Sequence, residues 1–399
     1  MNTVAETLEI VIAQIPKLAL EIVPIRDARG RILAQDLVAT RALPAFDNSA
    51  MDGYGARSAD LPAMVQVMGT VAAGEVPANE VAAGCAVRIF TGAMIPPGVD
   101  TVVIQEDAKV DGDRVVLPES PIGENIRRAG EDIAMGETVL TAGTRIGPAE
   151  LGMLAALGVI DVPVTRAPRV AIIATGDELV DAATPPGPGQ LVDSSAHAVT
   201  AMIRDAGGIP QSFGIARDDP MTLAALIASA LDHDVVITTG GVSVGDRDHV
   251  RAALASAGVT LEAYKVAMKP GKPFSFGMNG QENRSVPVFG LPGNPVSTFV
   301  AFELFVRPAL LAMQSATVTA RARAPVSVVR GYRKPAGRVH YIRAHVVRNG
   351  EYLVAHPHLK QGSAMLSSLI GCNALVELPA DATEIMPHST QLAVLLEPV

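Results

Sequence analysis

The chain has 399 residues, enough for roughly two to four domains of ordinary size. Apolar residues make up 49% and charged residues 18%, which is a globular and not a disordered composition. The net charge of -9 argues against general affinity for nucleic-acid backbones, and the 4% of aromatic residues, with no tryptophan, argues against a platform for stacking single-stranded bases.

The N-terminus does not resemble a secretory signal, because it has no basic segment and because Glu6 and Glu9 interrupt its apolar pattern. The most apolar long stretch, residues 296–313, contains Glu303 and Arg307. Charged residues at these positions predict a buried helix and not a membrane span. We therefore expect a cytoplasmic protein that binds neither membranes nor nucleic acid.

The first part of the chain predicts two kinds of unit. Residues 3–20 carry apolar side chains at helical spacing, and Pro16 predicts the end of that helix. Three short β-type runs separated by Gly and Pro then predict a small β-rich domain over residues 46–130; the runs are residues 65–67, 86–90 and 101–105.

A second helix is expected over residues 148–157. We expect it to pack against the N-terminal helix. The two segments 1–45 and 131–168 would then form one discontinuous linker domain on either side of the β-rich domain.

From residue 169 to 315 strands and helices alternate. The expected strands are residues 170–174, 211–215, 235–239 and 286–289, and the expected helices are residues 196–206, 221–231, 248–257 and 295–311. This alternation is typical of a doubly wound parallel α/β domain, in which ligands bind at the carboxyl ends of the strands. Residues 316–399 return to short β-type runs, which predict a C-terminal barrel-like or sandwich domain.

Chemistry is concentrated between residues 234 and 273. The strand at 235–239 ends at Gly240 and Gly241, which predicts a tight loop. Asp246 and Asp248 lie before the next helix, where a carboxylate holds a metal or caps the helix. Three lysines follow on a turn stiffened by Pro and Gly; they are Lys265, Lys269 and Lys272. Carboxylates beside clustered lysines favour a phosphate, a metal, or both.

Seven stretches closely resemble one family, the molybdenum-insertion enzymes of molybdenum-cofactor biosynthesis, called MoeA in bacteria and represented in animals by the C-terminal domain of gephyrin. They are PAFDNSAMDGYG (44–55), IFTGAMIPPGVDTVV (89–103), ATGDELV (174–180), TTGGVSVGDRD (238–248), KVAMKPGKP (265–273), GLPGNPVS (290–297) and KQGSAMLSS (360–368). The related molybdopterin adenylyltransferases resemble only the single α/β domain.

The resemblance implies a four-domain subunit in a homodimer, whose active cleft includes the small β-rich domain of the other subunit. It implies that the chain takes adenylylated molybdopterin and molybdate, transfers molybdenum to the dithiolene sulfurs, and releases AMP with the assistance of Mg²⁺. It also makes the molybdopterin adenylyltransferase a candidate partner.

The resemblance also implies roles for particular residues. The acidic positions expected to hold Mg²⁺ and to act in catalysis are Glu178, Asp218 and Asp248, joined in catalysis by Lys265 and Lys269. The expected oxyanion pocket for molybdate is Lys272, Pro273, Ser297, Arg343 and Ser363. The other expected substrate-binding residues are Asp193, Ser194, Gly240, Gly241 and Ser243, with Asp52 and Thr91 contributed by the second subunit.

Other interpretations are open for some of these residues and for the function. Asp246 reads better as a helix cap than as a metal ligand, whereas the motif reverses that order for Asp248. Ser195 stands where the family often has Asn. The serine hydroxyl can donate and accept a hydrogen bond, but it lacks the two-point contact that an amide side chain makes. A dimeric scaffold, an adenylyltransferase, an altered paralogue and a tungstate-specific enzyme are the alternatives to molybdenum insertion. The order of adenylate cleavage and metal insertion stays open at this point.

Overall fold

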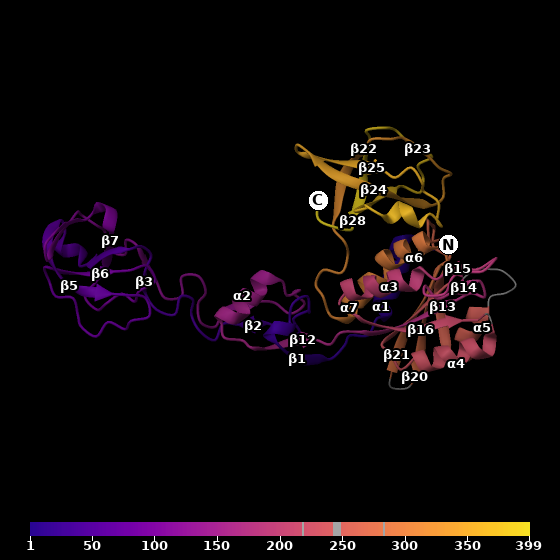
Figure 1. The fold of residues 1–399 in the computed structure, drawn as a ribbon, viewed down its shortest axis with the longest axis horizontal. Coiled ribbons are helices and arrows are strands. Elements are labelled where there is room, and N and C mark those ends of the chain that lie inside the picture. Colours follow the sequence, from indigo (N-terminus) through magenta and orange to yellow (C-terminus); the bar gives the residue numbers. More distant parts are fainter. Residues whose placement is uncertain (218, 242–248, 282–283) are drawn as a thin grey trace.

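The computed structural model describes residues 1–217, 219–241, 249–281 and 284–399. Figure 1 shows an elongated subunit in which a small β-rich unit stands at one end and both termini lie at the other. A linker unit lies between that β-rich unit and a pair of larger units, one α/β and one C-terminal. The multidomain fold predicted from the sequence is confirmed.

The small unit is built on one six-stranded sheet. Its order is β7 (Thr101–Ile104), β4 (Gly53–Ala56), β6 (Cys85–Ile89), β5 (Ala63–Val71), β9 (Arg114–Leu117) and β8 (Lys109–Asp111). A separate pair, β3 (Asn48–Ser49) and β10 (Ile126–Arg127), lies beside it. Gly53 is required where β4 meets β7, because a Cβ there would lie 2.1 Å from the carbonyl oxygen of Val103.

The linker unit joins segments that are far apart in the sequence. Antiparallel pairs form between β1 (Leu20–Pro24) and β12 (Asp161–Thr165), and between β2 (Leu37–Val38) and β11 (Thr138–Leu140). The helix α2 (Pro148–Ala156) packs beside them. The first helix, α1 (Val4–Gln14), does not pack against α2 as expected; its buried Val11 joins the core of the α/β unit instead.

The α/β unit contains a six-stranded sheet. Four strands are parallel, in the order β16 (Ile209–Ala216), β13 (Arg169–Thr175), β17 (Val235–Thr239) and β21 (Arg284–Leu291). Two further strands extend it antiparallel, β20 (Ser275–Gln281) and then β18 (Val259–Tyr264). The parallel strands confirm the predicted alternation, whereas the antiparallel pair was not predicted.

Helices cover both faces of this sheet. The face toward α1 is covered by α3 (Ser195–Asp205) and by a continuous helix made of α6 (Pro295–Ala301), a π-helical turn η4 (Phe302–Val306) and α7 (Arg307–Met313). The other face is covered by α4 (Pro220–Ala230) and α5 (His249–Ser256). Val170 and Ile172 of β13 face the first layer, and Ala171 and Ile173 face the second, as strand alternation requires.

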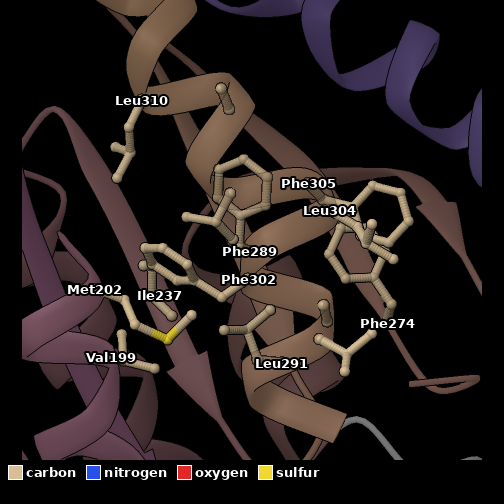
Figure 2. Close-up of a cluster of buried hydrophobic side chains, with 14 of the residues drawn as sticks. Val199, Met202, Ile237, Phe274, Phe289, Leu291, Phe302, Leu304, Phe305 and Leu310 are labelled. Carbon is tan, nitrogen blue, oxygen red and sulfur yellow. The ribbon is translucent and has the colours of Figure 1, made fainter. Parts of the chain in front are cut away.

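Aromatic side chains fill the first of these layers. Figure 2 shows Phe274 and Phe289 packed against Phe302 and Phe305 of the long helix. The rings of Phe274 and Phe305 have centroids 4.5 Å apart. Within the described part of the chain one helix, Pro295–Met313, is long and apolar enough to cross a membrane, yet 89% of its apolar window is buried inside the protein. That burial fits the predicted core helix.

The C-terminal unit is a closed barrel, as predicted. Its strands follow the order β24 (Val339–Asn349), β25 (Tyr352–Pro357), β22 (Arg323–Val328), β28 (Thr390–Leu395) and β26 (Ala374–Leu378), and β26 pairs back onto β24. A short pair, β23 (Tyr332–Arg333) and β27 (Glu384–Ile385), lies beside the barrel. The strand β19 (Met268–Lys269), which belongs to the α/β unit in sequence, pairs with β24 and so ties the two units together.

Candidate active site

A pocket of about 680 Å³ opens at the carboxyl ends of β13, β17 and β21. This is the edge where a doubly wound sheet places its ligands. The pocket is lined by the turn after β13, the start of α3, the turn after β17, the turn before α6, and a loop of the C-terminal unit. Pro273, Ser194 and Ser195 also line it. The location predicted from the sequence therefore coincides with a real cavity.

Two glycines give the pocket floor a bare backbone. Gly240 and Gly241 have φ angles of +94° and +65°, which side-chain-bearing residues rarely adopt. A Cβ on Gly240 would lie 2.4 Å from the carbonyl oxygen of Thr175, and one on Gly241 would lie 2.0 Å from a methyl group of Val250. Only glycine fits at either position, and both predicted residues line the pocket.

One of the three predicted acidic residues can be placed. Glu178 lies on the pocket wall after β13, and no described residue hydrogen-bonds to its carboxylate. The carboxylate lies over Gly176, where an added Cβ would be 2.7 Å from Oε2. Asp218 and Asp248 lie outside the described residues, as does the predicted substrate-binding Ser243. Within the described ranges, no three His, Cys, Asp or Glu residues form a group able to hold a metal ion.

Asp193 and Ser194 lie at the start of α3 on the pocket wall. The buried Asp193 accepts a hydrogen bond at Oδ1 from the Ala196 N–H at 3.0 Å, so it caps the first turn of α3. Ser195, the residue that departs from the family pattern, is the first residue of the helix and is also buried. These side chains therefore shape the helix end that faces the pocket.

The three lysines lie on one compact turn beside the pocket. The Lys265 N–H donates to the Phe274 carbonyl at 3.0 Å, and the Val266 N–H donates to the Lys272 carbonyl at 3.0 Å. Lys269, in β19, pairs in register with His340 of β24. Lys269 and Lys272 are exposed and Lys265 is half-buried, so the turn presents ammonium groups next to Pro273.

Of the five predicted oxyanion residues, Pro273 lines the pocket, and Ser297, Arg343 and Ser363 lie where the C-terminal barrel contacts the α/β unit. Ser297 is buried in the first turn of α6, and the Ser363 carbonyl accepts from the Val296 N–H at 3.2 Å. Arg343 on β24 is 1% exposed, and burial lowers the pKa of its guanidinium. Within the described residues its guanidinium donates to two carbonyls and a hydroxyl, not to a carboxylate; the acceptors are Lys360 O, Gly362 O and Ser368 Oγ.

Asp52 and Thr91 form a separate cluster in the small β-rich unit. Oδ1 of Asp52 accepts hydrogen bonds from both the N–H and the hydroxyl of Thr91, each at 2.8 Å. These bonds, followed by the charge of Arg88, hold the pKa of Asp52 below its usual value. Figure 1 shows the small unit at the opposite end of the subunit from α3 and β13, so the chain does not bring this cluster to its own pocket.

Three residues near these clusters were missed by the sequence analysis. Arg88 stands over two aromatic rings, with its guanidinium carbon 5.0 Å from the Tyr54 centroid and 5.4 Å from the Phe90 centroid. Ala364 and Leu366 line the pocket from the C-terminal loop. Arg88 lies between Asp52 and Thr91 in the sequence and directly precedes the stretch 89–103. Ala364 and Leu366 belong to the stretch 360–368, from which the resemblance singled out Ser363 alone.

Three family models match successive parts of the chain. They describe the MoeA N-terminal region (domains I and II) over residues 2–158, a probable molybdopterin-binding domain over residues 171–312, and the MoeA C-terminal region (domain IV) over residues 326–387.

Relatives and solved structures agree with these models. A molybdopterin molybdenumtransferase of Nostoc sp. is 40% identical over 78% of this chain and 74% of its own length. Molybdopterin molybdenumtransferase 2 of Mycobacterium tuberculosis is 36% identical over 93% of this chain and 94% of its own. The crystal structure of the molybdopterin biosynthesis MoeA protein of Pyrococcus horikoshii matches with a TM-score of 0.87 at 32% identity, covering 99% of this chain and all of that one. The chain therefore belongs to the MoeA family of molybdopterin molybdenumtransferases.

Proposed function

We propose that the protein inserts molybdenum into molybdopterin during molybdenum-cofactor biosynthesis, using adenylylated molybdopterin and molybdate and releasing AMP. The observation that carries this proposal is the pocket at the carboxyl ends of β13, β17 and β21, whose floor is bare glycine backbone. Pro273, which directly follows the turn that carries the three lysines, also lines this pocket. Membership of the family supports the identity of the substrates.

The pocket floor is suited to the phosphates of the nucleotide. Gly240 and Gly241 leave backbone groups uncovered, and the start of α3 adds the positive end of a helix dipole. We propose that Lys269, exposed on the turn that leads to Pro273, offsets charge on the departing AMP when the phosphoanhydride bond breaks.

The contact between α6 and the C-terminal loop is suited to the tetrahedral dianion. Lys272 and Arg343 supply positive charge, while Ser297 and Ser363 supply hydroxyl donors. The low exposure of Arg343 strengthens its attraction for an anion, because little water screens it. We propose that molybdate binds here, beside the dithiolene. Tungstate has nearly the same size and charge, so we expect it to compete for the same place.

Mg²⁺ fits the chemistry of the acidic residues. Hard carboxylate oxygens are its usual protein ligands, and the carboxylate of Glu178 stands on the pocket wall with no described hydrogen-bond partner. We propose that Glu178, Asp218 and Asp248 hold the ion, which when bound neutralises the pyrophosphate. The role of the last two residues is inferred from the sequence alone.

The separation of Asp52 and Thr91 from the pocket supports a homodimer. Both residues match family positions, yet the subunit places their unit far from its own pocket (Figure 1). We propose that the small unit of a second copy supplies them to the pocket. We also propose that the dimer works in the cytoplasm and receives its substrate from the molybdopterin adenylyltransferase.

The test is AMP release by purified protein given adenylylated molybdopterin and Mg²⁺, with or without molybdate, together with the molybdenum content of the pterin product. We expect AMP release to depend on molybdate and molybdenum to appear in the product. Binding of the nucleotide without release or transfer would contradict the proposal and favour a scaffold.

A matched pair of variants sharpens this test. Asp248→Asn is expected to nearly abolish turnover while the dimer stays folded, because the resemblance places Asp248 among the metal-binding carboxylates. Asp246→Asn is expected to keep turnover, because Asp246 reads as a helix cap. An active Asp248→Asn protein would remove that residue from the mechanism.

A further inference from the structure

The side chain of Gln361 takes the place of a strand hydrogen bond at the edge of the C-terminal barrel. The regular pairing of β24 with β25 ends at Ala344 and Pro357. The next pair would be Arg343 and His358, and the His358 N–H does donate to the Arg343 carbonyl at 2.9 Å. The reciprocal bond is replaced: the Arg343 N–H donates to Oε1 of Gln361 at 3.2 Å, and Nε2 of Gln361 donates to the His358 carbonyl at 2.8 Å.

Hydrogen bonds run in both directions between Arg343 and the segment around Gln361. Nε2 of Gln361 also donates to the Arg343 carbonyl at 3.0 Å, so the amide engages both backbone polar groups of Arg343. In return, one nitrogen of the Arg343 guanidinium donates to the carbonyls of Lys360 and Gly362, which flank Gln361, at 3.2 and 3.1 Å. The orientation of this buried guanidinium therefore depends on where the Gln361 backbone lies.

The same loop forms one wall of the pocket. Nε of Arg343 donates to Oγ of Ser368 at 3.0 Å, which fixes the far end of the loop. Between the two anchors, Ser363 accepts from the Val296 N–H of α6, and Ala364 and Leu366 line the pocket. A shift of the loop at Gln361 would move both the guanidinium of Arg343 and the hydroxyl of Ser363.

We propose that Gln361 is a positioning residue for the oxyanion, acting through Arg343 and Ser363 without touching the ligand itself. This inference rests on the proposed function, because it assumes that a tetrahedral dianion binds at this loop. Groups behind a binding shell commonly change affinity by about tenfold or more, because they set the orientation of the contacting groups. The glycine floor proposed for the nucleotide phosphates contains no residue of this loop, which reaches the pocket through Ala364 and Leu366, so the larger effect should be on the oxyanion.

The test compares Gln361→Met with Gln391→Met. Gln391 lies in the same barrel, and among the described residues its side chain has one hydrogen bond, from Nε2 to Oγ of Ser389 at 3.4 Å, so it is the matched control. Molybdate and adenylylated molybdopterin are titrated separately into the full-length protein by calorimetry. We expect Gln361→Met to raise the Kd for molybdate by about tenfold and to leave the Kd for the nucleotide within about twofold. The control should change neither.

A second variant guards against misfolding of the first. Gln361→Glu keeps an acceptor for the Arg343 N–H but loses the donor to two carbonyl oxygens and places a negative charge against those oxygens. We expect it to weaken molybdate binding at least as much as Gln361→Met. Hydrogen exchange of the amides of residues 360–368 should accelerate in both variants and not in the control.

Unchanged molybdate affinity in both Gln361 variants, with a wild-type protein that binds molybdate, would overturn this inference and leave the proposed function intact. Equal loss of molybdate and nucleotide binding would also overturn it, because that result describes a general structural defect. A wild-type protein that binds neither ligand would overturn the proposed function and the inference together.

Discussion

The pocket of the α/β unit and the Asp52 cluster of the small unit differ in how their polar groups are held. The pocket is built on buried strand ends, close-packed glycines and a loop anchored by a buried arginine. The Asp52 cluster depends on the hydrogen bonds of one exposed threonine at the surface of a remote sheet. The groups of the pocket are thus preorganised inside one subunit, whereas the cluster faces outward and is available to another molecule.

This difference predicts that substitutions in the two regions will affect different properties of the protein. Changes to buried polar groups around the pocket should cost folding stability, because water cannot replace the lost partners. Changes to the exposed cluster should cost activity and leave stability nearly unchanged. The predictions below test this contrast.

Glu178→Gln should give the largest effect, a fall in turnover of about a hundredfold or more. Its carboxylate lines the pocket and has no described hydrogen-bond partner, so the loss concerns the substrate and the proposed metal, not the fold. Turnover and the melting temperature should be measured together. A variant that keeps more than half of its activity would remove Glu178 from the site.

Arg321→Met should lower the free energy of unfolding by about 3 kcal/mol or more, because the buried carboxylate of Glu303 loses the guanidinium that donates to both of its oxygens. Nε of Arg321 lies 2.9 Å from Oε2 of Glu303, whose side chain is 4% exposed. This ion pair ties the long helix below the pocket to the C-terminal unit. Urea denaturation measures the effect.

Arg333→Met is the matched control, because Arg333 pairs with the exposed Glu384 on the outside of the barrel. Its stability should stay close to that of the unaltered protein. Equal destabilisation by both substitutions would contradict the contrast between buried and exposed groups.

His340 should make stability depend on pH below neutrality. The ring is 2% exposed, and neither nitrogen has a hydrogen-bond partner in the part of the chain that the structure describes. Burial, followed by the charge of Lys269, lowers its pKa from 6.5 to about 4. Between these values the unfolded chain binds more protons than the folded protein. This contribution to stability is therefore complete above pH 6.5 and decreases as the pH falls toward 4, by as much as about 3 kcal/mol.

Unfolding curves at pH 7 and pH 4.5 measure this contribution. His340→Leu should show a smaller decrease in stability between the two pH values than the unaltered protein. An identical decrease in both proteins would exclude His340 as its source.

Thr91→Val should give the smallest effect, a loss of activity of about fivefold with an unchanged melting temperature. The substitution removes the hydroxyl bond to Asp52 and keeps the backbone N–H bond. The pKa of Asp52 should rise, because one of the groups that lower it is lost, so the acidic limb of the pH–activity profile should move to higher pH. A lower melting temperature would show that the cluster has a structural role.

The location of the pocket was predictable from the sequence because it depends on the topology of the sheet alone. In a parallel sheet the carboxyl ends of the strands share one edge, so Glu178 after β13 and Gly240 and Gly241 after β17 were expected to line one site once the alternation of strands and helices was recognised. Asp193 follows the separate short strand β15 (Leu191–Val192), and only the resemblance pointed to it. The short β-type runs after residue 316 predicted a barrel or a sandwich, and the structure shows a closed barrel. The two-part linker was expected from two helical segments, but α1 packs on the α/β unit and not on α2.

Other features depend on contacts that no local pattern encodes. The strand β20 reads SFGMNGQ, and its glycines hide its place in the sheet. The periodicity of α1 shows an apolar face but does not say which unit that face packs against. A lone arginine on a strand, such as Arg343, is ordinarily exposed, and its burial depends on a loop about twenty residues away.

The central claim is that a pocket in one subunit is completed by the small unit of a second copy, and mixing two inactive variants tests it most directly. Asp52→Ala and Glu178→Gln would be co-expressed with different tags, and the heterodimers would be compared with each homodimer. If the site is shared, each heterodimer contains one intact site, and random mixing should restore about a quarter of wild-type activity. Heterodimers as inactive as the two parents would contradict the shared site.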